Sequence, residues 1–253
     1  MDYLAHFRRE ILEFEAAVRQ VPGDAPLIAS CPGWSTSDLV AHLGGVQRYV
    51  IRLISTRATV PPDPMEISYM RLPADTEGWP MPDTAPNLGL MPAGLIDWFA
   101  EGAAELAELF ATTASDTPVW TWSREQTAGF WLEMQTIEAA VHRWDANNQP
   151  IDHELARSAI EQTFTVMAPF RRARQKAPAG QGERFRFTDG TISRTVQFSG
   201  DDVQLVDGSG DVELLGTASD LMLFLWQRVP ADHFDITGDR EVLDRYFTLV
   251  PPV

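Results

Sequence analysis

The stretch FWLEMQTIEAAVHRWDA, residues 130–146, decides the fold of the first part of the chain. Its apolar side chains recur at the spacing of one face of an α-helix, at Phe130, Met134, Ile137, Val141 and Trp144. The residues NNQPID that follow are typical of a helix end and a loop. A helix is therefore predicted from about residues 123–127 to about Asn147.

Two metal-binding residue types lie at the edge of this apolar stripe. Glu138 and His142 are four residues apart, and side chains at that spacing lie on the same side of a helix, with Cβ atoms roughly 5–6 Å apart. Both could therefore reach one ion. The spacing alone is a weak signal, because it also arises in ordinary solvated pairs.

The rest of the N-terminal part of the chain shows the same helical spacing of apolar residues. Helices are predicted over about 3–21, from residue 35, over about 93–111 and over about 153–175. Ser35 suits a helix N-cap, with Asp38 completing a capping-box arrangement. Residues 61–92 are rich in proline and turn residues and predict a long loop.

The pattern changes after residue 176. The segments RFRF, TISRTVQF, DVQLV and DVELL alternate in polarity and are separated by turn signals, which predicts short strands. SDLMLFLWQRV then indicates a helix, HFDITGD a last strand, and REVLDRYFTLV a short final helix. We predict an α+β protein, with a helical bundle over 1–176 and a small α+β domain over 177–253.

A third candidate ligand, His42, comes from the second predicted helix. Its neighbours Leu39, Leu43 and Val46 place it on the inward side of that helix. A hydrogen-bonded core histidine is the alternative role. Gly44 and Gly45 follow, and each costs about 1 kcal/mol in mid-helix relative to alanine, so we expect either close helix packing or room for a ligand.

Together, His42, Glu138 and His142 would make a three-ligand metal site. Catalytic zinc sites use three protein ligands and leave one position open. Two imidazoles and one carboxylate suit zinc, while nickel, iron and manganese remain alternatives.

Composition excludes several other classes of function. The chain has 253 residues, 44% of them hydrophobic, and a net charge of −16, which disfavours nucleic acids and anionic membranes as partners. No apolar run approaches the roughly 20 residues that span a bilayer, and the N-terminus does not resemble a signal peptide, so a cytoplasmic location is expected. Cys31 is the single cysteine, which rules out an internal disulfide and a cysteine-based structural zinc site.

Three stretches resemble the mycothiol-dependent maleylpyruvate isomerase family. They are CPGWSTSDLVAHLGG at 31–45, IEAAVHRWDA at 137–146, and GTASDLMLFLWQRV with FDITGDREVLDRY within 216–246. The resemblance implies a DinB-like four-helix bundle followed by a small α+β domain. It also implies that His42, Glu138 and His142 bind a divalent metal, usually zinc, and that mycothiol serves as cofactor or cosubstrate.

The implied chemistry is attack of a metal-activated thiolate on an electrophilic carbon. Departure of the thiolate after bond rotation gives cis–trans isomerisation, whereas retention gives S-transfer, and the metal ligands do not distinguish the two. The alternative is a non-catalytic metal-binding or sensor module. The expected partners are a small thiol and an electrophile, and the sequence indicates no oligomeric state. Arg228 is the candidate catalytic cation for an anionic substrate, or else a cation at a helix C-terminus.

The residues near these candidates are expected to have mainly structural roles. Arg143 is expected in a surface or interdomain ion pair. Asp145 could orient a ligand histidine, although a cap or salt bridge is preferred. Cys31 and Trp34 are expected to pack the loop before the second helix, with a pocket mouth as the alternative for Trp34.

Overall fold

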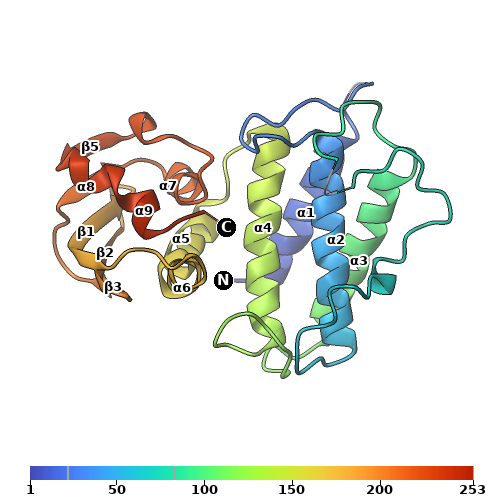
Figure 1. The fold of residues 1–253 in the computed structure, drawn as a ribbon, viewed down its shortest axis with the longest axis horizontal. Coiled ribbons are helices and arrows are strands. Elements are labelled where there is room, and N and C mark those ends of the chain that lie inside the picture. The colour runs from blue at the N-terminus through green and yellow to red at the C-terminus, as the bar shows by residue number, and fades with distance from the viewer. Residues whose placement is uncertain (22, 82–83, 253) are drawn as a thin grey trace. The chain divides into compact units, whose positions relative to one another are not determined.

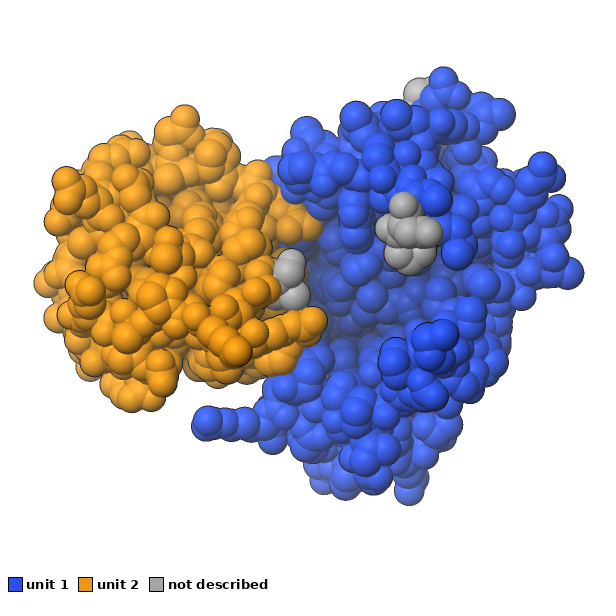
Figure 2. Space-filling view, in the orientation of Figure 1, with its two compact units in different colours: residues 1–149 blue, residues 150–253 orange. Residues whose placement is uncertain are grey.

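The computed structural model of the chain describes residues 1–21, 23–81 and 84–252. It divides into two compact units, an N-terminal unit of residues 1–149 and a C-terminal unit of residues 150–253 (Figure 2). The predicted order, helices first and a small mixed sheet second, is confirmed (Figure 1). Among the described residues, no helix has the length and apolarity needed to cross a membrane.

The N-terminal unit is built on four long helices. They are α1 (Tyr3–Val18), α2 (Thr36–Ser55), α3 (Leu95–Thr112) and α4 (Ala128–Asn147). α1 packs against α3 and α4, and α2 packs against the same two helices, so the four enclose one core. This core is apolar and aromatic, as the buried edge-to-face pair Phe14–Phe99 illustrates. The bundle thus brings α2 and α4, which carry the candidate ligands, side by side.

Local sequence signals fix where these helices begin. Ser35 caps α2, and both halves of the capping box with Asp38 are formed, as predicted. Thr127 caps α4 by accepting from the Phe130 amide. The predicted loop over 61–92 contains one short 3-10 helix, η1 (Ser68–Met70), in its described part, and its residues 82–83 lie outside the described residues.

The glycine pair of α2 provides space for neighbouring side chains. A Cβ on Gly44 would collide with the indole of Trp98 from α3, and one on Gly45 would approach Met70. Close packing, rather than room for a ligand, therefore explains Gly44.

The C-terminal unit begins with one long, interrupted helix. α5 (His153–Gln162) continues through a π-helical turn, η2 (Thr163–Met167), into α6 (Ala168–Gln175). In that turn the Ala168 amide bonds to the Thr163 carbonyl, five residues back. Pro169 follows at the start of α6, and since proline cannot donate a backbone hydrogen bond, the wider turn accommodates it.

A five-stranded sheet with the order β3-β2-β1-β4-β5 completes this unit. Its strands are β1 (Gly180–Thr188), β2 (Ser193–Gly200), β3 (Asp202–Val206), β4 (Val212–Leu215) and β5 (Asp235–Gly238). Only the β1–β4 pair is parallel among these neighbours. Helices α7 (Ala218–Leu225), α8 (Arg240–Asp244) and α9 (Tyr246–Leu249) and the 3-10 turn η3 (Ala231–His233) connect or follow the strands. Phe185 and Phe187 of β1 are buried, while Arg184 and Arg186, which alternate with them, are not, as the alternation predicts.

The division between the units differs from the boundary expected after residue 176. It falls between Gln149 and Pro150, because α5 packs against α7 and the π-turn packs against β3. The helical period of 153–175 indicates that these residues form a helix but does not indicate which element covers its apolar face.

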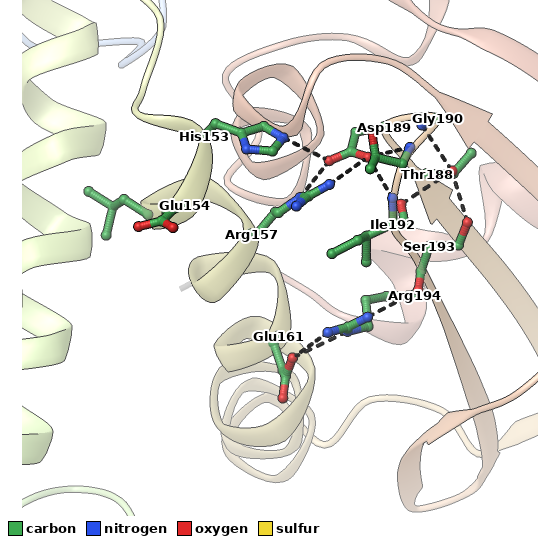
Figure 3. Close-up of polar contacts among 12 residues, drawn as sticks. His153, Glu154, Arg157, Glu161, Thr188, Asp189, Gly190, Ile192, Ser193 and Arg194 are labelled. Atoms are coloured by element: carbon green, nitrogen blue, oxygen red, sulfur yellow. Dashed lines mark hydrogen bonds and ion pairs between the residues drawn. The ribbon is translucent and has the colours of Figure 1, made fainter. Parts of the chain in front are cut away.

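Asp189 organises the turn between β1 and β2 (Figure 3). Its carboxylate accepts both guanidinium bonds of Arg157, at 2.7 and 3.0 Å, and lies 3.1 Å from His153 Nε2. It also accepts the amides of Thr191 and Ile192. The Arg157 hydrogen bond, assisted by the two amides, outweighs burial and holds the pKa of Asp189 well below its usual value.

We expect Asp189→Asn to destabilise the C-terminal unit by about 1.5–3 kcal/mol at neutral pH, the range for hydrogen bonds to a charged group. Because the folded-state pKa is depressed, the stabilisation is present above the unfolded value of about 3.9 and declines as pH falls toward the folded value. Urea unfolding at several pH values should show the gap between variant and wild type shrinking below about pH 4. A pH-independent gap would contradict this.

Glu161→Gln is the matched control. Glu161 pairs with Arg194 at 3.0 Å, but the two side chains are 50% and 40% exposed. The cost of removing such a surface pair is below about 1 kcal/mol.

Candidate metal centre

Three side chains from two helices converge inside the N-terminal unit. His42 extends from α2, and Glu138 and His142 extend from α4. One potential ligand atom from each lies within 4.8 Å of the other two. His42 Nε2 is 3.3 Å from Glu138 Oε1, and the two imidazole centroids are 5.2 Å apart. The bundle thus brings together the three residues predicted from sequence as metal ligands.

The protonation states of the two α4 residues suit a cation. Burial opposes ionisation of Glu138, but the hydrogen bond from His42, the electrostatic influence of the two nearby imidazoles and the Gln135 hydrogen bond hold the Glu138 pKa below its usual value. Burial also lowers the pKa of His142, against the opposing influence of Asp145. A carboxylate and a neutral imidazole are the forms that bind a metal.

Asp145 fixes the orientation of His142. Its Oδ2 lies 2.9 Å from His142 Nδ1, which leaves Nε2 as the ring nitrogen available to an ion. The Asp145 side chain is 0% exposed. Its other oxygen accepts from Ser30 Oγ at 2.6 Å, and Cys31 Sγ lies 3.3 Å from Oδ2. Asp145 therefore ties the loop before α2 to the end of α4, in the orienting role that sequence reasoning ranked second.

The donor set fits a divalent cation with an open position. The His42 side chain is 33% exposed, while those of Glu138 and His142 are 18% and 7% exposed, so the group is sheltered but open at His42. Gln135 Nε2 donates to Glu138 Oε2 at 2.9 Å, which leaves Oε1 toward His42. Trp34 packs its ring 4.8 Å from that of His42.

A second group of potential ligands, Cys31, His142 and Asp145, also meets the 4.8 Å separation. Asp145 Oδ2 already accepts hydrogen bonds from the other two members, Cys31 and His142, and its Oδ1 accepts one from Ser30. The group with His42 and Glu138 is the better donor set, because Asp145 would serve there as the hydrogen-bond partner of His142 rather than as a ligand.

The structure corrects one expectation beside the site. Arg143 lies inside the bundle, 1% exposed, rather than on the surface. Its Nε donates to Glu10 Oε2 of α1 at 2.8 Å, and Nη1 donates to the Gln149 carbonyl. Sequence reasoning missed this pair because Glu10 lies 133 residues away in the chain.

Arg228 belongs to the C-terminal unit, just after α7. It is half-buried, and its Nη1 donates to the Trp226 carbonyl at 2.8 Å. Its proposed role toward an anionic substrate stays a prediction.

Comparison with known proteins gives consistent matches for both units. A family model for the mycothiol maleylpyruvate isomerase N-terminal domain matches residues 4–147, and one for the MDMPI C-terminal domain matches residues 154–245. No curated protein sequence matches the chain. The family matches agree with the three motifs identified in the sequence.

Two crystal structures of mycothiol-dependent maleylpyruvate isomerase share the fold. A histidine-to-alanine variant superposes with a TM-score of 0.61 at 16% identity, and a second structure with 0.59 at 17%. Each comparison covers 94% of this chain and 93% of the other. At these identities the likeness shows the fold alone.

Proposed function

Because the chain belongs to the mycothiol-dependent maleylpyruvate isomerase family, we propose that it is an enzyme that uses mycothiol and a divalent cation, with zinc the first candidate. His42, Glu138 and His142 would hold the cation. The convergence of their three ligand atoms within 4.8 Å carries the proposal. A cation bound there would favour the thiolate form of an incoming thiol.

The residues of the chain have separate roles in this scheme. Glu138 would provide negative charge, and the Asp145 contact at Nδ1 would leave His142 Nε2 as the nitrogen that binds the ion. The exposed side of His42 leaves an approach for an external thiol. Cys31 contacts Asp145 through its sulfur, so the reactive sulfur is assigned to mycothiol rather than to the chain.

Sulfur addition to an electrophilic carbon is the common first step. The thiol gives up its proton to solvent, a carbon–sulfur bond forms, and the electron pair of a carbon–carbon double bond moves to the adjacent carbon. Rotation about the resulting single bond, followed by expulsion of the thiolate, gives the isomer, and the thiolate regains its proton from solvent or begins another turnover. If the carbanion is protonated instead, the product is a thioether.

The direct test combines zinc-loaded protein, mycothiol and a panel of electrophilic alkenes, with products identified by mass spectrometry. We expect isomer or thioether that forms with zinc-loaded protein and not with metal-free protein. Binding of both zinc and mycothiol without any product across the panel would contradict the enzymatic proposal and favour a sensor module.

A separate prediction concerns Asp145. Asp145→Asn should weaken zinc binding by about 10–100-fold, the usual cost of losing an outer partner of a metal-binding histidine. Competition with a chromophoric chelator measures this change. Ser30→Ala is the matched control, because it removes the 2.6 Å bond to the other carboxylate oxygen and spares the His142 contact. Equal zinc affinities for the two variants would refute the orienting role.

A further inference from the structure

Arg171 of α6 is a buried cation that no acidic side chain among the described residues pairs with. It is 6% exposed, and its Nε is buried without a hydrogen-bond partner. No hydrogen bond or ion pair joins its guanidinium to any residue that the structure describes, and its one ring contact is with Trp226, 5.5 Å from the centroid. Burying an unpaired charge is costly, so this arrangement requires an explanation.

The adjacent Arg172, whose Nε also has no hydrogen-bond partner among the described residues, shows how this unit satisfies the two Nη groups of a buried arginine. Arg172 is 4% exposed, and its guanidinium donates to three backbone carbonyls, those of Leu249, Pro178 and Gly200. It therefore ties α6 to the sheet and the C-terminus. Arg171 has no such role, although it lies on the same helix at similar depth.

The surroundings of Arg171 add positive charge. Arg228 is bonded to the carbonyl of the same Trp226 whose ring contacts Arg171. Burial and the charge of Arg228 both lower the pKa of Arg171, opposed by Tyr246. An arginine nevertheless stays protonated in proteins. Two cationic side chains therefore contact Trp226, Arg171 at its ring and Arg228 at its carbonyl.

Tyr246 of α9 is a second unsatisfied donor in this region. It is 0% exposed, and its hydroxyl has no hydrogen-bond partner among the described residues. Tyr246 and Arg171 influence each other electrostatically. Burial raises the pKa of Tyr246, so the group remains a neutral hydroxyl able to donate.

We propose that Arg171 and Tyr246 form the donor side of a carboxylate-binding site in the C-terminal unit, with Arg228 supplying further positive charge. A carboxylate fits because it is planar, carries one negative charge and accepts two parallel guanidinium bonds. The Trp226 ring contacts the guanidinium, which limits its freedom before a ligand arrives. The residues of this site all belong to the C-terminal unit, whereas those of the proposed metal centre all belong to the N-terminal unit.

Thermal unfolding of the metal-free full chain tests the site, with sodium acetate or malonate exchanged for sodium chloride at constant ionic strength. A ligand that binds only the folded state raises the melting temperature. We expect such a rise for wild type, and affinity weaker by about tenfold or more in Arg171→Met. Tyr246→Phe, which loses a neutral donor, should weaken binding by about two- to tenfold.

Arg172→Met is the matched control. It should lower the melting temperature, because three carbonyls lose their donor, but keep the carboxylate response. Arg171→Met should not lower the melting temperature in chloride, because it removes an unpaired buried charge. If Arg171→Met fails to fold, Tyr246→Phe and Arg171→Lys replace it in the test. Arg171→Lys should weaken carboxylate binding, because lysine lacks the planar guanidinium group that makes two parallel hydrogen bonds.

Two results would overturn the proposal. One is an equal carboxylate response in wild type and in the Arg171 and Tyr246 variants. The other is a response to inorganic phosphate or chloride but not to acetate or malonate. Once binding is established, enzyme kinetics distinguish a carboxylate of the electrophile from a free carboxylate as the ligand. If the site holds a carboxylate of the electrophile, Arg171→Met raises KM for the acid and not for its methyl ester. Unchanged KM for both, with binding intact, assigns the site to a free carboxylate.

Discussion

His42→Ala abolishes stoichiometric zinc binding, and with it thiol-dependent turnover, if the proposed centre is correct. The variant removes one of three converging ligands, so its effect on zinc affinity should exceed the roughly 10–100-fold loss expected for an outer partner. Glu138→Gln should act in the same direction, because it preserves shape but removes the negative charge. Elemental analysis of the purified proteins and product formation by mass spectrometry are the two measurements.

His233→Ala is the control for this experiment. His233 lies in the C-terminal unit, is 54% exposed at its side chain and pairs loosely with Asp220 at 3.6 Å. Its removal should leave zinc content unchanged. If His42→Ala retained wild-type zinc, the three-ligand centre would have to be abandoned.

Arg143→Met should be the most destabilising substitution in the bundle outside its apolar core. Arg143 and Glu10 are 2% and 1% exposed at their side chains, and breaking a buried pair leaves a charge without its partner. We expect a loss of about 3 kcal/mol, the lower end of the usual range, because Arg9 still bonds to Glu10. Urea unfolding followed by tryptophan fluorescence measures the change.

The double variant Arg143→Met with Glu10→Leu distinguishes charge burial from simple loss of contact. Replacing both members of a buried pair by apolar residues is often neutral or stabilising, so the double variant should recover much of the lost stability. Arg8→Met is the surface control, since Arg8 and Glu108 are 45% and 73% exposed, and it should cost below about 1 kcal/mol. A single-variant loss as small as that of Arg8→Met would contradict the account.

The bundle and the candidate ligands could be predicted because their signals are periodic and local. The apolar stripe around Ile137 defines α4, the Ser35–Asp38 capping box sets the start of α2, and the spacing of Glu138 and His142 follows from helix geometry. Polarity alternation likewise anticipated Phe185 and Phe187 as buried strand residues. In each case the information lies within a few residues of sequence.

The remaining features depend on partners that lie far apart in the chain. The sequence around Arg143 does not identify Glu10 as its partner, and nothing near Arg171 indicates that its Nε finds no hydrogen-bond partner among the described residues. The division between the compact units differs from the expected boundary for the same reason, because the apolar face of α5 is covered by α7, which follows more than fifty residues later. Asp145 was visible at three residues from His142, yet a cap or surface salt bridge explains that spacing equally well.

The central claim is that a metal held by His42, Glu138 and His142 receives the sulfur of an external thiol. Cobalt(II)-substituted protein titrated with mycothiol tests this most directly, because a thiolate bound to cobalt gives a charge-transfer absorption that neither component shows alone. We predict that the band appears and saturates with wild type and is missing in His42→Ala. An unchanged cobalt spectrum at saturating mycothiol would contradict the account.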